Sequence, residues 1–252
     1  MSEPANAGPR RDPRPRSGRG KRPKFVPALQ FRFLTRFYDP LLERFFRDRE
    51  RKQRLVDLGR PRARELVLDL GGGTGTLASL LLDTEPACRV VVVDIDLAML
   101  LQARRKVAAG RAALLAASAD ALPLATGSFD RAFSSLFFHH LLPAAKRRAL
   151  AELHRGLRSG ASFFLLDFGR PRDPLMWLLS WLGRLFDGWA NTRENFDGRL
   201  LALIASAGFT APEELGRERS PFGLLVYYHS RAGGSSGRDA ARVDAARVEV
   251  RR

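Results

Sequence analysis

The sequence predicts a doubly wound α/β fold, in which a mostly parallel β-sheet carries helices on both faces. Between residues 66 and 168, short apolar runs typical of buried strands alternate with longer stretches typical of amphipathic helices. Several of the short runs are apolar throughout, which indicates that both faces of the sheet are covered. The first run also passes directly into a glycine-rich loop at residues 71–75, which is a turn expected at a strand-to-helix connection in this fold.

The elements follow in order along the chain. Apolar side chains recur at helical spacing between residues 33 and 46, which predicts an N-terminal helical cap ahead of the sheet. Asp96 is well placed to cap the helix that follows it. The expected strands are 66–70, 90–94, 112–117, 131–137, 162–168 and 223–230. The expected helices are 76–83, 97–108, 144–158 and 198–207.

Length and composition are those of one globular domain with tails. The chain has 252 residues, of which 45% are hydrophobic and 28% charged, which excludes wholesale disorder. Its single cysteine, Cys88, excludes a disulfide framework and a cysteine-rich zinc site, so no metal is expected. No apolar run approaches the ~18 residues of a membrane-spanning helix. The Arg/Pro-rich start lacks the apolar core of a secretory signal, so we expect a cytoplasmic protein.

Much of the net charge of +16 lies in the two tails. Residues 1–24, rich in Pro, Gly and Arg, predict a disordered basic tail, and 232–252 a flexible C-terminal tail, which leaves 25–231 as the domain. Such charge is compatible with binding to nucleic acid or an anionic membrane. Because the tails lack interleaved aromatic residues, solvated tails are favoured and no nucleic acid partner is expected.

Two motifs compete for the glycine loop. A loose dinucleotide-binding fingerprint can be read from Gly73, but counted from Gly71 its third glycine position is Thr76. The pattern acid-x-Gly-x-Gly-x-Gly instead fits Asp69, Gly71, Gly73 and Gly75 without adjustment. An acid so close to the loop is unfavourable for a pyrophosphate and suits a cationic ligand.

This second pattern resembles motif I of the class I S-adenosylmethionine-dependent methyltransferases. The resemblance extends over about 25–230: VVVVDIDLAML resembles that family's second strand, and SADALPLATGSFDRAFSSLFFHHL its adenine loop and fourth strand. ALAELHRGLRSGASFFLLDFGRP resembles its fourth helix and fifth strand. The resemblance to this family implies a Rossmann-like sheet of seven strands. The segments LLDFGRP and FYDP resemble the ubiquinone/menaquinone-biosynthesis methyltransferases and their relatives, although His139-His140 stand where that subgroup has Arg-Asn.

The resemblance implies S-adenosylmethionine as cofactor. S-adenosylmethionine has a cationic sulfonium and an amino-acid end, and it has no phosphate that the acid beside the loop would repel. Asp94 would accept hydrogen bonds from both ribose hydroxyls, since a carboxylate can accept two, and Asp120 would accept from the adenine amine. The cofactor-binding residues expected by motif are Asp69, Gly71, Gly73, Gly75, Asp94, Ile95, Met99, Asp120 and Ser135, with Ile95 and Met99 near the adenine ring.

Candidate catalytic residues follow the fourth strand. The chain lacks the Pro-Cys pair of cytosine C5 methylation and the Asn/Asp-Pro-Pro-Tyr/Phe motif of adenine or glutamine methylation. His139 and His140 are candidate general bases, because imidazole titrates near neutral pH. The alternative is that one histidine caps or packs at the next helix. Tyr38 is a further candidate on the substrate side.

The segment 174–189 contains all three tryptophans of the chain and is apolar around much of a helix. Three interpretations remain open: a core helix, a lid (174–195) over an apolar acceptor, or a helix on a membrane surface. We therefore predict methyl transfer to a small, apolar acceptor, such as a quinone-like compound, a lipid or another metabolite, with possible peripheral membrane contact. The alternatives are an RNA methyltransferase that uses the basic tail, a non-catalytic binding protein, or an NAD(P)-dependent oxidoreductase.

Overall fold

The computed structural model describes residues 47–107 and 111–234. Tyr38, the expected N-terminal helical segment, the basic tail 1–24 and nearly all of the C-terminal tail lie outside the described residues. The elements, in chain order, are α2 (Asp48–Gly59), β1 (Leu66–Leu70), α3 (Thr76–Thr84), β2 (Arg89–Asp94), α4 (Leu97–Lys106), β3 (Ala112–Ala116), β4 (Phe129–Ser135), the 3-10 helix η2 (Phe138–His140), α5 (Pro143–Gly156), β5 (Leu157–Phe168), α6 (Pro174–Asp187), α7 (Trp189–Phe196), α8 (Leu200–Ser206), β6 (Glu213–Ser220) and β7 (Gly223–Arg231).

Seven strands form one sheet in the order β3-β2-β1-β4-β5-β7-β6. Strands β1 to β5 pair in parallel, whereas β7 is antiparallel to both β5 and β6. The strand order reverses between β1 and β4, and ligands in open α/β sheets bind at the carboxyl ends of strands at such a switch point. The predicted fold class, a Rossmann-like, mostly parallel seven-stranded sheet, is confirmed.

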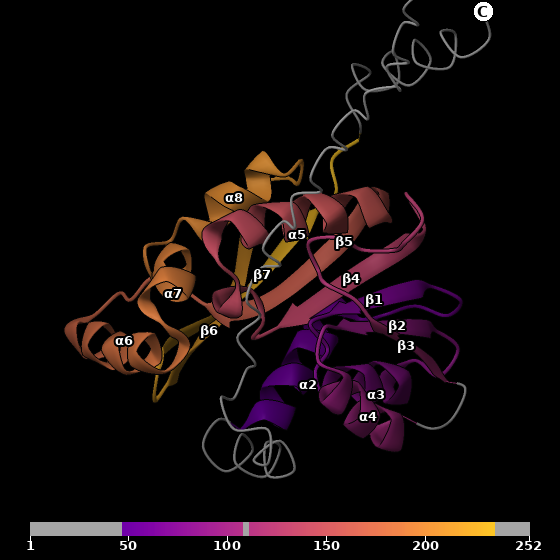
Figure 1. Cartoon of the computed structure of the whole chain (residues 1–252), viewed down its shortest axis with the longest axis horizontal. Helices are drawn as coiled ribbons and strands as arrows, with labels where there is room; N and C mark the ends of the chain where they lie inside the picture. The colour runs from indigo at the N-terminus through magenta and orange to yellow at the C-terminus, as the bar shows by residue number, and fades with distance from the viewer. Residues whose placement is uncertain (1–46, 108–110, 235–252) are drawn as a thin grey trace, which may run out of the picture.

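Helices cover both faces of the sheet (Figure 1). On one face, buried leucines of α2 and α3 pack with Phe133, Phe164 and Tyr227 of the sheet. On the other face, buried side chains of α5 and α8 pack with Phe163 and with the side chains of β1, β4 and β7 that point to that face. The purely apolar strands therefore lie between two cores, as their composition predicted.

Most predicted elements are found, with ends that differ by a few residues. The cap at Asp96 is confirmed, because its carboxylate accepts a hydrogen bond of 2.8 Å from the Ala98 N–H. The strand expected at 131–137 spans Phe129–Ser135. It ends early because Leu136 adopts a left-handed conformation (φ 53°), which takes the chain out of the sheet. The helix expected at 144–158 likewise ends at Gly156, where β5 begins.

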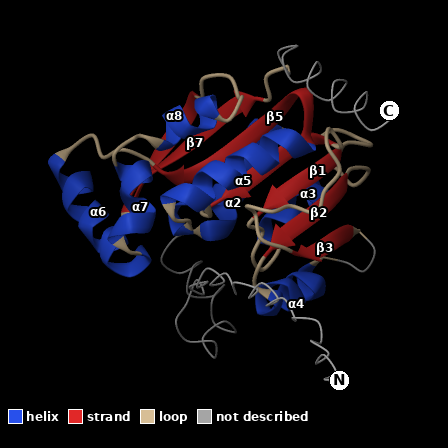
Figure 2. Ribbon diagram, turned by 45° about the horizontal axis from the view of Figure 1, so that its top comes forward, coloured by secondary structure: helices blue, strands red, loops and turns tan. Residues whose placement is uncertain are grey.

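Segment 174–189 lies at one end of the molecule, where α6 and α7 extend past the last strands (Figure 2). Trp177, Trp181 and Trp189 are 57%, 46% and 49% exposed. Helix α6 also contacts β7, and its Met176 and Ser180 are buried, so one face packs on the core while the tryptophans leave another face exposed. No helix within the described residues combines the length and apolar character that crossing a membrane requires.

Candidate functional site

The glycine loop follows β1 at the switch point. The N–H groups of Gly71 and Gly72 donate to the carbonyl of Val93 over 2.8 and 3.1 Å, which holds the loop beside the end of β2. Gly71, Gly73 and Gly75 have φ of 71°, 54° and 76°, a backbone conformation that favours glycine. A Cβ at Gly73 would meet no atom of the described residues within 4 Å, so this glycine borders open space.

The far side of the loop is closed by α4. A Cβ at Gly75 would lie only 2.8 Å from the Cβ of Ala103, so glycine permits the close approach of α4. Lys106 of the same helix donates hydrogen bonds of 2.8 and 2.7 Å to the hydroxyls of Thr74 and Thr76. The loop is thus tied to α4 on one side, and its open side is at Gly73.

Asp94 ends β2 next to this open side. One carboxylate oxygen accepts from the Gly73 N–H at 2.9 Å, and the other accepts from the Asp96 N–H at 2.8 Å. Burial raises its pKa, and the backbone hydrogen bonds partly oppose that rise. The two backbone donors fix the carboxylate, and each oxygen keeps a further lone pair for a pair of hydroxyls.

Asp69 lies beneath the loop and is fully buried. Neither of its carboxylate oxygens makes a hydrogen bond of normal geometry to the residues that the structure describes. Burial raises its pKa, the charge of Lys52 and the amide of Ala78 oppose the rise, and the charge of Asp94 adds to it, so that the pKa is about 7. Such an acid costs free energy unless a donor or cation reaches it. It therefore fits a ligand with a cationic group, as the methionyl end of S-adenosylmethionine has.

The residues expected around the adenine ring lie on the β2–β3 side. The Ala117 N–H donates to the Asp94 carbonyl at 3.0 Å, which brings the turn after β3 beside the loop. Asp120 in that turn accepts from the Ser118 hydroxyl and, over 2.7 Å, from Arg148. These contacts lower its pKa. Met99 is buried, Ile95 is 44% exposed, and the buried Ser135 hydroxyl has no partner among the described residues.

The histidine pair lies in η2, beyond β4. Nδ1 of His139 lies 2.8 Å from a carboxylate oxygen of Asp167, which is fully buried near the end of β5. Asp167 also accepts from the N–H groups of Phe138 and Phe168, over 2.9 and 2.7 Å. A carboxylate at Nδ1 favours the tautomer with the proton on Nδ1, so Nε2 becomes the proton-accepting nitrogen.

His140 differs from its neighbour in its environment. The two imidazole rings have centroids 4.0 Å apart. Burial, followed by the charges of His139 and Lys146, holds the pKa of His140 well below its usual value. Lys146 is itself fully buried and donates to Glu194 over 3.0 Å and to Asn195 over 2.9 Å. This network attaches α7 to α5 beside the histidine pair.

Sequence reasoning did not single out Asp167 or Lys146. Asp167 follows the same pattern as Asp94, an acid near the end of an apolar strand, and this signal could have identified it. Lys146 carried no such signal, because its burial depends on contacts with α7. Within the described part of the chain, no three His, Cys, Asp or Glu side chains are arranged to hold a metal ion.

Comparison with known proteins identifies the family. A family model of the methyltransferase domain matches residues 67–160. The demethylmenaquinone methyltransferase of Thermus thermophilus is 33% identical over 188 residues, which cover 70% of this chain and 82% of that protein. The ubiquinone/menaquinone biosynthesis C-methyltransferase of Paracoccus denitrificans is 37% identical over 132 residues, or 50% of this chain and 52% of that protein. The match thus spans about half the length of that second relative.

A solved structure shares the fold. Human N-acetylserotonin methyltransferase, in complex with S-adenosylmethionine, superimposes with a TM-score of 0.59 at 18% identity and covers 79% of this chain and 56% of that one. Sheet order, glycine loop and relatives agree on one class of protein, the methyltransferases with a Rossmann-like fold. The chain belongs to the class I S-adenosylmethionine-dependent methyltransferases, and S-adenosylmethionine is the cofactor of this family.

Proposed function

We propose that this protein transfers a methyl group from S-adenosylmethionine to a small, apolar acceptor with a quinone-like ring. The observation that carries the proposal is the contact between the loop and Asp94, in which the Gly73 N–H fixes the carboxylate at the open side of the loop. The quinone-like acceptor is supported by the names of the two curated relatives. The chain matches only 52% of the Paracoccus protein, so a quinone-like acceptor is proposed for this chain and is not taken over from that relative.

The residues of the loop would hold the cofactor from three sides. Asp94 accepts from a hydroxyl pair, Asp69 faces a cationic group, and the backbone at Gly73 permits close approach. When bound, S-adenosylmethionine supplies an activated methyl group. The contribution of the protein is to hold the acceptor close to that group and in line with it, which can lower the barrier by several kcal/mol.

His139 would accept the proton that the acceptor loses. Methylation of a hydroxyl releases the hydroxyl proton, and methylation of a ring carbon releases the ring proton, so both routes need a proton acceptor. Asp167 orients the imidazole of His139 and would stabilise its protonated form. His140 is less suited to this role because its depressed pKa makes it a weak base.

The tryptophans of α6 and α7 support an apolar acceptor. The indole rings of Trp177 and Trp181 lie 5.5 Å apart, and those of Trp181 and Trp189 lie 5.1 Å apart, as a continuous aromatic surface. Arg184 lies 4.3 Å from the Trp189 ring centroid, where its cation stabilises the edge of that surface. An exposed apolar surface of this kind is typical of a site that receives an apolar partner.

The test is a methyl-transfer assay with isotopically labelled S-adenosylmethionine and a short-chain naphthoquinol, read by mass spectrometry. We expect a singly methylated product, and fragmentation assigns the methyl to carbon or oxygen. Total RNA and catechol serve as competing acceptors. Labelled RNA without labelled quinol would overturn the proposal in favour of an RNA methyltransferase. Binding of S-adenosylhomocysteine with no product from any acceptor would favour a binding protein.

A further inference from the structure

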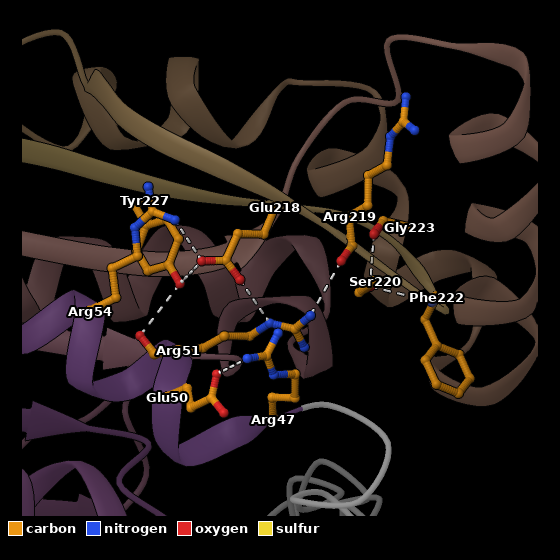
Figure 3. Close-up of polar contacts among 10 residues, drawn as sticks. All are labelled: Arg47, Glu50, Arg51, Arg54, Glu218, Arg219, Ser220, Phe222, Gly223 and Tyr227. Atoms are coloured by element: carbon orange, nitrogen blue, oxygen red, sulfur yellow. Dashed lines mark hydrogen bonds and ion pairs between the residues drawn. The ribbon is translucent and has the colours of Figure 1, made fainter.

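Helix α2 precedes the region matched by the family model, yet it is anchored beside the site. Arg51 and Arg54 of this helix bind the two carboxylate oxygens of Glu218 on β6, over 3.1 and 2.8 Å (Figure 3). The Tyr227 hydroxyl on β7 donates to Glu218 over 2.9 Å. Arg51 also donates to the Arg219 carbonyl at 3.3 Å. The β6–β7 hairpin therefore anchors the first turns of α2.

These turns carry a nearly buried ion pair. The ammonium of Lys52 donates to one carboxylate oxygen of Asp48 over 2.9 Å, and their side chains are only 13% and 7% exposed. The other oxygen, Oδ1 of Asp48, is buried without a hydrogen-bond partner among the described residues. An ammonium has three N–H donors, and the bond to Asp48 uses one of them. The pair therefore keeps both an acceptor and donors for a ligand.

The pair also acts on the acid beneath the glycine loop. The positive charge of Lys52 counteracts the raised pKa of Asp69, so the two side chains interact electrostatically. Helix α2 packs against α3, the helix that the loop begins. Asp69 lies directly against that loop, since a Cβ at Gly72 would clash with its Oδ2 at 2.8 Å. Two carboxylates and one ammonium thus share this side of the site.

A purely structural ion pair does not account for this arrangement. Buried polar atoms are nearly always hydrogen-bonded, and each exception costs stability. Here Asp48 Oδ1 and both carboxylate oxygens of Asp69 are such exceptions among the described residues. A ligand that satisfies these atoms needs a positively charged group that binds the two acids and a negatively charged group that binds Lys52. An α-amino acid zwitterion has both.

We propose that Asp48 and Lys52 of α2, together with Asp69, bind the α-amino acid end of the cofactor. Lys52 donates to the α-carboxylate, and Asp48 Oδ1 and Asp69 accept from the α-ammonium. The proposal rests on the proposed function, because it assumes S-adenosylmethionine as ligand. It gives α2 a role in recognition of the cofactor and assigns Glu218 as the residue that positions this helix.

Two ligands that differ only in this end provide the test. S-adenosylhomocysteine carries the amino acid end, whereas 5′-methylthioadenosine keeps the adenosine and the sulfur without it. Calorimetric titration of the Lys52→Gln variant should show S-adenosylhomocysteine weakened by about tenfold or more, the effect of one charge-assisted hydrogen bond. The affinity for 5′-methylthioadenosine should stay within about twofold. Arg49→Gln removes a charge from an exposed position in the same turn and should alter neither affinity.

The outcomes separate this proposal from the one on which it rests. If wild type binds neither ligand, the proposed function fails. If wild type binds both and Lys52→Gln weakens both equally or neither, only the role of α2 is refuted. Retained binding of 5′-methylthioadenosine shows that the variant is folded. Lys52→Arg should recover part of the loss, and Asp48→Asn should again weaken S-adenosylhomocysteine selectively.

Discussion

Replacement of Asp69 by asparagine should stabilise the unliganded protein at pH 8 and leave its stability nearly unchanged near pH 4. Asparagine imitates the neutral acid, so the variant does not have to bury an ionisable carboxylate. The pKa of Asp69 is about 7 in the folded chain, against 3.8 for an aspartate exposed to solvent. At ~1.4 kcal/mol per pH unit, a difference of roughly 3 units corresponds to about 4 kcal/mol.

The sign follows from proton binding. Between pH 4 and 7 the folded wild-type protein retains a proton on Asp69 that the unfolded chain has lost. The wild type therefore loses stability as the pH rises through this window, and the difference from the variant reaches its full size above pH 7. The assay is urea unfolding of both proteins at pH 4, 5, 6, 7 and 8, at constant ionic strength.

A matched control is Asp83→Asn, which removes an exposed acid from α3. This variant should follow the wild type across the whole pH range. If the stability difference produced by Asp69→Asn is constant from pH 4 to 8, the carboxylate does not titrate with a raised pKa and the reasoning is refuted. Asp69→Asn should also weaken S-adenosylhomocysteine, because a neutral amide accepts from an ammonium less strongly than a carboxylate does.

Three further predictions concern the other parts of the site. Asp94→Ala should weaken S-adenosylhomocysteine by about 1.5–3 kcal/mol in a calorimetric titration, and unchanged affinity would remove Asp94 from the site. Asp167→Asn should lower kcat by roughly 10²–10⁴-fold with little change in the affinity for S-adenosylhomocysteine, and an unchanged kcat would contradict the proton-acceptor role. An apolar acceptor analogue or anionic vesicles should shift the tryptophan emission, and Trp177→Ser with Trp181→Ser should abolish the response; emission unaffected by both would refute a binding role for α6.

The parts of the fold that the sequence predicted have local signals. An apolar strand, a glycine turn and an acid at the end of the next strand each depend on neighbours in the sequence, and all three lie where they were expected. Strand β6 was not predicted because it is an edge strand whose residues, EELGRERS, include no buried apolar run. It is recognisable only through its pairing with β7, to which it contributes Glu218.

The polar residues that sequence reasoning missed depend on tertiary contacts. Lys146 and Lys52 look like ordinary surface lysines on helices, and both are nearly or fully enclosed in the structure. Their partners Glu194 and Asp48 are equally unremarkable in the sequence. What distinguishes them is desolvation, which requires knowledge of the elements packed around each helix. Sequence motifs therefore predicted the position of the glycine loop, whereas the buried charged groups were identified only from the structure.

The end of β4 connects the two halves of the proposed site. Leu136 has a left-handed backbone (φ 53°) that its side chain disfavours, and its N–H donates to the Leu166 carbonyl over 2.8 Å. Strained residues are retained where the surrounding structure requires them, often at functional sites. After this turn the Phe137 ring lies against Gly71, where a Cβ would come within 2.2 Å of it. Two residues later, His139 reaches Asp167. One strained turn thus places Phe137 against the glycine loop and His139 against Asp167, the residue that orients the proposed proton acceptor.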